Sequence, residues 1–191
     1  MRRPLTLVAV IATLALGLVG PATAAAPAAQ PTARTGSCHR TLASYPVLEP
    51  GARGAAVRTL QCAVNDLGLG PLTVDGWYGP QTRGAIRRIE SSFEGPAPHP
   101  GRVNNGFWVL LFGRHLPDRT LRPGQHGPAV RTLQRALRAA GAKVAVNGKF
   151  GKGTRHAVKA FQRSQSVAPS GVVNENTRFF LSQGAAIHGL N

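Results

Sequence analysis

The side chains that could do catalytic chemistry are few and scattered. The six histidines lack the spacing of a His-Glu-x-x-His zinc site. The seven carboxylates are too dispersed to nominate a general acid and base, although a pair formed only by folding stays open. The Ser-x-x-Lys and Gly-x-Ser-x-Gly patterns of serine nucleophiles are missing. The sequence therefore predicts no catalytic residue, no metal site and no cofactor, and so no enzyme.

Two short clusters are better suited to binding. Each combines an acidic or amide side chain with aromatic and basic ones around a glycine. Basic side chains can bind carboxylates, and exposed aromatic rings can stack on sugars or alkyl chains. The candidate ligand-binding residues are Asp75, Trp77, Tyr78, Gln81 and Arg83 in the first cluster and Asn147, Lys149, Phe150, Lys152 and Arg155 in the second.

Several candidates have a structural alternative. Tyr78 and Phe150 share one position, and a shared aromatic residue in a small domain often belongs to the core. Asp75, like its counterpart in the second cluster, precedes a glycine and suits a turn. Trp77 has Lys149 as its counterpart, which makes Trp77 the better candidate for ligand contact.

Both clusters belong to a tandem repeat. Residues 48–61 return at 121–134, and residues 74–83 return at 146–155. Two matched blocks in the same order predict two similar small domains. Gln61 and Gln134 each follow a leucine expected to be buried, and we expect both to hydrogen-bond a nearby loop.

Apolar periodicity predicts three helices in each copy. In copy one, the apolar positions are 57, 60, 64 and 67 for the first helix, 85, 86, 89 and 93 for the second, and 107–111 for the third. Gly68 and Gly141 are expected to follow the first helix of each copy, and Pro80 suits a first turn. The expected fold is all-α: two tandem three-helix bundles.

The N-terminus has the pattern of an export signal. Two arginines precede an apolar run at 5–19, and residues 22–24 offer a cleavage site. The run is too short for a comfortable membrane span, so we expect a released chain, with a retained anchor as the alternative. The predicted organisation is a signal peptide at 1–24, a flexible leader at 25–44, domains at 45–113 and 121–184, a connector at 114–120 and a tail at 185–191.

Export makes a disulfide the expected state of Cys38 and Cys62. The bond would tie the N-terminal segment to the first helix and add about 3 kcal/mol of stability. A catalytic thiol, or a metal site using Cys38 and His39, fits less well because no histidine is paired with Cys62.

The chain is strongly basic. It has 23 Lys and Arg against 7 Asp and Glu, and loss of the signal arginines leaves a net charge near +14. Such an excess indicates a polyanionic neighbourhood. For an exported protein this would be a cell wall, an anionic glycan or a lipid surface, although genome composition can also raise the arginine content.

Copy two resembles the secreted three-helix peptidoglycan-binding module. The matching residues are Leu121, Gly124, Gly127, Val130, Leu133, Gln134, Asn147, Gly148, Phe150, Gly151, Thr154, Ala157, Val158, Phe161, Gln162, Gly171, Val172, Val173, Thr177 and Leu181. Copy one matches as far as Thr82 and then departs: Ile89 and Glu90 replace the Phe-Gln pair, and Phe107 stands where Thr177 would.

The resemblance implies that the chain binds bacterial peptidoglycan without cleaving it. Two alternatives remain: a secreted scaffold that docks or regulates a cell-wall hydrolase, and a basic protein that binds another polyanion. An anionic polymer associated with the wall is also a possible ligand, and nucleic acid is not expected for an exported chain. Two linked modules would gain avidity on a repetitive polymer, provided that both bind.

Overall fold

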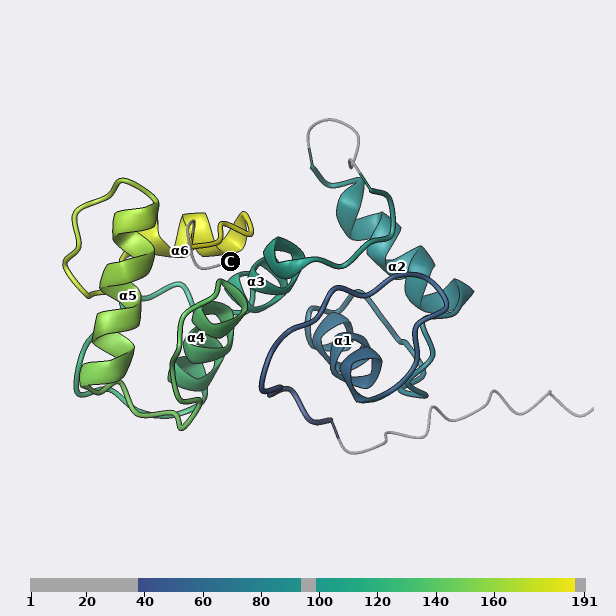
Figure 1. The fold of residues 1–191 in the computed structure, drawn as a ribbon, viewed down its shortest axis with the longest axis horizontal. Helices are drawn as coiled ribbons and strands as arrows, with labels where there is room; N and C mark the ends of the chain where they lie inside the picture. The colour runs from purple at the N-terminus through teal and green to yellow at the C-terminus, as the bar shows by residue number, and fades with distance from the viewer. Residues whose placement is uncertain (1–37, 94–98, 188–191) are drawn as a thin grey trace, which may run out of the picture. The chain divides into compact units, whose positions relative to one another are not determined.

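The computed structural model describes residues 38–93 and 99–187. This part of the chain folds into helices joined by irregular loops, which confirms the predicted all-α class (Figure 1). The helices are α1 (Ala55–Asp66), α2 (Pro80–Glu90), α3 (Asn105–Gly113), α4 (Pro128–Ala139), α5 (Lys152–Ser164) and α6 (Glu175–Ser182). None of the helices in the described ranges is both long and apolar enough to cross a membrane. The predicted signal peptide lies outside these ranges.

The helix ends follow local chemistry. Pro80 begins α2, and Gly68 and Gly141 adopt positive φ just after α1 and α4, as expected. Asn104 caps α3 by accepting a hydrogen bond from the Phe107 N–H. One boundary was predicted wrongly: α2 ends at Glu90, so Phe93 lies in the following turn rather than on the helix, although it still packs against the core.

The loops of the two repeats are tied together in the same way. Isolated antiparallel bridges join Leu48 to Val103 and Arg53 to Trp77 in the first repeat. The corresponding bridges in the second repeat are Leu121 to Val173 and His126 to Lys149. Each repeat therefore brings the loop before its first helix against the loops that precede its second and third helices.

Helix α3 is buried by both repeats. It is apolar on all sides, and residues 107–113 are buried. It contacts α1 of its own repeat and α4 and α6 of the second repeat. Gly113 permits the close approach, because a Cβ there would lie 2.2 Å from the carbonyl oxygen of Leu181. The third helix of the first repeat thus forms the centre of the contact between the repeats.

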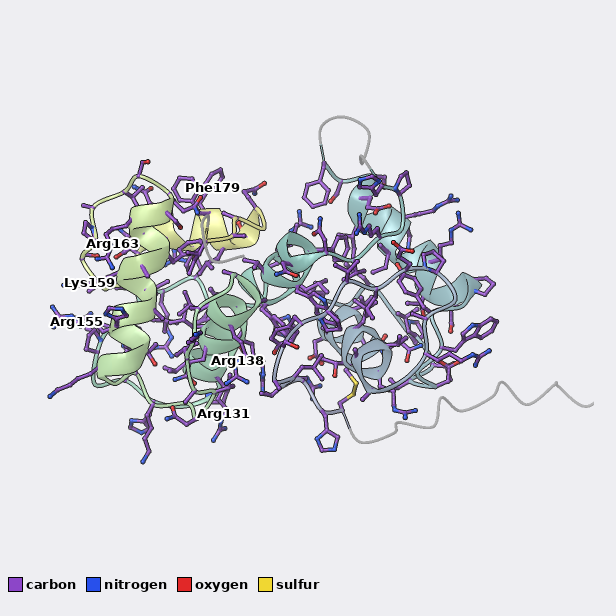
Figure 2. The ribbon with its side chains drawn as sticks, in the orientation of Figure 1. Arg131, Arg138, Arg155, Lys159, Arg163 and Phe179 are labelled. Carbon is purple, nitrogen blue, oxygen red and sulfur yellow. A yellow bond between two sulfur atoms is a disulfide. The ribbon has the colours of Figure 1, made fainter. Side chains whose placement is uncertain are left out.

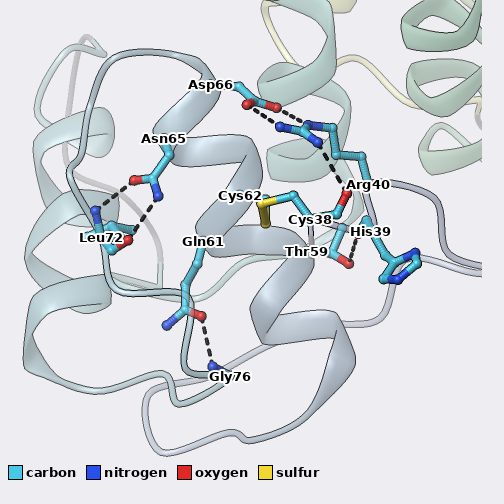
Figure 3. Close-up of a disulfide and its surroundings, with 10 residues drawn as sticks. All are labelled: Cys38, His39, Arg40, Thr59, Gln61, Cys62, Asn65, Asp66, Leu72 and Gly76. Atoms are coloured by element: carbon cyan, nitrogen blue, oxygen red, sulfur yellow. Dashed lines mark hydrogen bonds and ion pairs between the residues drawn. A yellow bond between two sulfur atoms is a disulfide. The ribbon is translucent and has the colours of Figure 1, made fainter. Parts of the chain in front are cut away.

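The segment at 38–45 is attached to α1. Cys38 and Cys62 form the predicted disulfide (Figure 3). Arg40 forms an ion pair with Asp66 at the end of α1, and the Thr59 hydroxyl donates to the carbonyl of His39 at 2.6 Å. Residues 38–44, which were predicted as the end of a leader, are therefore packed against the first repeat.

The second repeat holds the same segment from its other side. Arg135 occupies the position in α4 that Cys62 occupies in α1, and its Nε donates to Thr41 Oγ1 at 3.0 Å. Arg138 donates to the carbonyl of Leu42 at 2.8 Å. Equivalent positions of the two repeats thus hold one N-terminal strap, residues 38–45.

Candidate functional site

A buried glutamine organises the loop before the second helix of each repeat. The Gln61 carbonyl accepts from Gly76 N–H at 2.9 Å, and its amide donates to the Trp77 carbonyl and Thr82 hydroxyl. In the second repeat, Gln134 makes the matching bonds to Gly148, Lys149 and Thr154. The prediction that these glutamines bond a nearby loop is confirmed.

A third glutamine network was not predicted. Gln162 on α5 accepts from Gly171 N–H at 2.9 Å and donates to the Val172 carbonyl and the Thr177 hydroxyl. The pattern of a glutamine, a later glycine and a threonine early in the next helix is visible in the sequence and could have revealed it. Its counterpart in the first repeat is Glu90, whose two carboxylate oxygens accept from Gly101 N–H.

The acidic or amide candidates stabilise the turn. Asp75 Oδ1 accepts from Trp77 N–H at 2.8 Å and from the Gln61 amide at 2.7 Å. Asn147 accepts in the same way from Lys149 N–H. Burial opposes ionisation of Asp75, but the hydrogen bonds from Trp77 and Gln61 outweigh it, so the pKa of this carboxyl lies below its usual value.

The shared aromatic residues support the loop from inside. Tyr78 is 1% exposed and Phe150 is 2% exposed, so neither ring is open to a ligand from solvent. The Tyr78 hydroxyl donates to the Gly101 carbonyl at 2.7 Å. Burial, with a contribution from Glu90, raises the pKa of Tyr78 far above its ordinary value.

Trp77 is the aromatic candidate that reaches solvent. It is 40% exposed, and the guanidinium of Arg53 lies 5.2 Å from the centre of its ring. Together with Arg83, it borders an open cavity of about 410 Å³ at the start of α2. The full lining is Pro50, Gly51, Trp77, Tyr78, Gly79, Pro80, Arg83, Gly84 and Arg87. Gln81 instead bonds the loop, through Thr73 N–H and the Pro71 carbonyl.

The same region of the second repeat has different chemistry. Lys149 replaces Trp77, Lys152 replaces Pro80, and Lys159 replaces Arg87, while Arg155 matches Arg83. Lys149, Lys152 and Arg155 are exposed, and Lys159 is half-buried. Sequence reasoning missed the second-turn cations at 87 and 159, which the four-residue spacing from 83 and 155 could have indicated.

The charge of the chain is concentrated in the second repeat. Residues 121–184 carry eleven Lys and Arg side chains and one acidic side chain. Residues 45–113 carry six Lys and Arg side chains and five acidic side chains. Composition alone cannot explain this contrast, because both repeats come from one chain. The second repeat is thus the part that would attract an anionic partner.

Metal sites and free thiols are two further kinds of chemistry with which the described ranges can be compared. Within 38–93 and 99–187, no group of three or more His, Cys, Asp or Glu could hold a metal ion. The disulfide also removes the alternative of a free catalytic thiol at Cys62. The described residues therefore offer surfaces suited to binding, with cationic and aromatic contacts.

Comparison with known proteins identifies the class. The family model described as a putative peptidoglycan binding domain matches residues 53–98 and 126–181, more than half of the chain. The chain belongs to this family, as its resemblance predicted. No curated protein matches it significantly.

Solved structures match a part of the chain. A peptidoglycan-binding protein from Clostridioides difficile, in complex with glutamine hydroxamate, is 28% identical over 34% of this chain and 41% of its own, with a TM-score of 0.33. A Burkholderia AP3 phage endolysin is 41% identical over 35% of this chain and 26% of its own, with a TM-score of 0.34. A fused Zn-dependent amidase/peptidase/peptidoglycan-binding domain-containing protein from Clostridium acetobutylicum is 31% identical over 34% of this chain and 29% of its own, with a TM-score of 0.33. The chain spans less than half the length of these three proteins.

Proposed function

We propose that the protein is an exported, non-catalytic binder of bacterial cell-wall peptidoglycan. Membership of the peptidoglycan-binding family supports the ligand. The disulfide suits an oxidising compartment outside the cytoplasm, and the N-terminal sequence suits export. The cell wall is therefore the place where we expect this chain to act.

The observation that carries the proposal is the open cavity beside Trp77. An exposed indole face can stack on a sugar ring or an alkyl side chain. Arg83 and Arg87 border the same cavity, and their guanidinium groups can bind the free carboxylates of stem peptides. Peptidoglycan presents both chemical groups close together, so the cavity in the first repeat is the proposed binding site.

Substitution of Trp77 in the full exported chain tests this proposal. We expect Trp77→Ala to weaken retention on purified sacculi, stripped of secondary polymers, by about tenfold, the range measured when aromatic contacts at interfaces are removed. Phe179→Ala is the matched control, because Phe179 is 57% exposed and lies in α6 of the other repeat. Equal retention of both variants and the wild type would reject the cavity as the site.

One feature of the second repeat supports the alternative that the protein is a secreted scaffold that docks or regulates a cell-wall hydrolase. Phe179 aligns with Val109, a fully buried residue of α3, and α3 is the helix that contacts α4 and α6 of the second repeat. An exposed aromatic residue at a position that docks protein in the first repeat favours protein contact. A secreted wall hydrolase would be the partner, and binding of a purified hydrolase that Phe179→Ala abolishes, without any retention on sacculi, would favour this alternative.

A further inference from the structure

Three cations follow one another along α5. Arg155, Lys159 and Arg163 are separated by four residues each, so they lie on one side of the helix with about 6 Å of rise between successive members (Figure 2). We call these residues the basic row. It covers about 12 Å of helix length, which is longer than a single carboxylate or phosphate group.

The first two members of the row are held together by the turn at Gly171. A Cβ at this glycine would lie 2.8 Å from Cγ of Arg155 and 3.1 Å from Cε of Lys159. The turn itself is fixed by Gln162, which accepts from the Gly171 N–H and donates to the Val172 carbonyl. Both cations therefore rest on a rigid surface, which lowers the side-chain entropy lost when an anion binds.

No acidic side chain compensates the row. In residues 38–93 and 99–187, the ion pairs join Arg40 to Asp66, Arg102 to Glu49 and Arg178 to Asp118, and none includes a member of the row. The only acidic residue at 121–184 is Glu175. Three like charges side by side repel one another, so an anion placed along them would be stabilised.

The first repeat lacks the complete row. The aligned positions hold Arg83, Arg87 and Ser91, and the glutamine between the last two is replaced by Glu90. The third cation and the neutral neighbour therefore belong to the second repeat alone. This difference suggests a ligand other than the one proposed for the cavity beside Trp77.

We propose that the basic row binds a linear phosphodiester polymer of the cell wall. A phosphodiester polymer carries one negative charge in each repeating unit, so neighbouring phosphates can reach successive cations. Arginine forks also match phosphate geometry. The carboxylates of a stem peptide are too isolated to fill three positions along one helix. Single-stranded nucleic acid sites add stacking aromatic residues to their cations, and the row contains none.

Binding to synthetic poly(glycerol phosphate) tests the proposal. The variant Arg155→Gln/Lys159→Gln/Arg163→Gln removes the row. Its control, Arg119→Gln/Arg122→Gln/Lys143→Gln, removes three exposed cations outside the row and has the same net charge as the row variant. We expect the row variant to bind at least about tenfold more weakly at 50 mM salt, and the control to stay within about threefold of the wild type.

Salt dependence gives a second measurement. Three phosphate contacts should cost the wild type roughly 20- to 40-fold in affinity between 50 and 200 mM salt, and the row variant should lose this part of the dependence. Equal losses in the row variant and its control would overturn the proposal, because net charge would then be the cause. Equal binding of poly-glutamate or a DNA oligonucleotide would overturn the assignment to phosphodiester wall polymers.

This test is separate from that of the peptidoglycan site. Stripped sacculi contain no phosphodiester polymer, so Arg163→Gln, which changes the one row member outside the candidate peptidoglycan contacts, should be retained on them like the wild type and should bind poly(glycerol phosphate) more weakly. Trp77→Ala should in turn bind poly(glycerol phosphate) normally. Each proposal can therefore fail without the other.

Discussion

The two repeats share their loop supports and differ in the surface that these supports present. A buried glutamine fixes the Asp75 turn in the first repeat and the Asn147 turn in the second with nearly identical hydrogen bonds. On this common support the first repeat exposes Trp77, and the second exposes Lys149. The comparison teaches that the buried polar residues of the module are shared while their exposed neighbours differ between the repeats.

The repeats also differ in what their third helices contact. Helix α3 is enclosed by its own repeat and by α4 and α6. Helix α6 leaves Phe179 exposed and buries Thr177 and Leu181. The first repeat therefore contributes a helix that is buried on all sides to the contact between the repeats, whereas α6 joins this contact through α3 and still exposes Phe179.

Of the substitutions that test this comparison, removal of a glutamine network should cause the largest loss of stability. Gln134→Leu would leave the N–H groups of Asn147 and Gly148 without their acceptor and would take one donor from the Lys149 carbonyl. We expect a loss of about 4 kcal/mol in the free energy of unfolding, since each such group costs about 1–3 kcal/mol. Urea unfolding followed by circular dichroism measures the loss.

The control for this prediction is Gln125→Leu in the same repeat. Gln125 is half-buried, and its side chain accepts a hydrogen bond from the exposed backbone N–H of Arg122. Its replacement should cost about 1 kcal/mol or less. Similar losses for the two variants would contradict the view that the Gln134 network supports the second repeat.

The disulfide should have the next largest effect, and it belongs to the first repeat alone. Cys38→Ser opens a bond that spans a sequence separation of 24 residues. The chain-entropy model predicts a loss of about 3 kcal/mol. Arg135, at the position matching Cys62, holds the same strap by one exposed hydrogen bond, so Arg135→Ala should cost about 1 kcal/mol.

Denaturant unfolding of the oxidised wild type and the two variants measures this difference. Reduction of the wild type should reproduce the stability of Cys38→Ser. If Cys38→Ser were as stable as the oxidised protein, the covalent bond would add nothing to the stability of the first repeat, and the contrast between covalent and polar attachment would fail.

Much of the architecture could be predicted because periodic patterns report burial directly. The stripe containing Val57 and Leu60 gave α1, and the glycines at 68 and 141 gave its end and that of α4. The pairing of Cys38 with Cys62 followed from export and from the cysteine count. These features depend on local sequence or on one covalent choice.

The remaining features depend on contacts that repeat matching does not show. The ion pair between Arg40 and Asp66 joins segments 26 residues apart, so the strap looked like a flexible leader. The matched blocks stop at Arg83 and Arg155, which left Lys159 outside the candidate site. The role of α3 between the repeats was visible only as an apolar run without a polar face. Tertiary packing decides such cases.

The smallest predicted effect compares Asp75 with Asn147 at equivalent turns. Hydrogen bonds hold the pKa of Asp75 below its usual value of 3.8, so ionised Asp75 stabilises the folded state above that pH. This contribution is lost as pH falls through the lower, folded pKa. Asp75→Asn should therefore cost a few tenths of a kcal/mol at pH 7, given the solvent exposure of the turn, and progressively less as pH falls through the folded pKa.

Thermal unfolding of the wild type and Asp75→Asn between pH 2 and 7 measures this difference. Asp66 also has a lowered pKa, because Arg40 donates to it, so both proteins should lose stability in acid. Only the difference in stability between the two proteins measures the contribution of Asp75. Asn147→Asp provides the reverse substitution, and it should create a small pH dependence of stability in the second repeat. Because an ionised carboxylate gains from nearby Lys149 and Arg131, we expect this variant to be at least as stable as the wild type at pH 7 and to lose that gain in acid. A constant gap between Asp75→Asn and the wild type across this pH range would mean that the two turns differ in shape and not in charge.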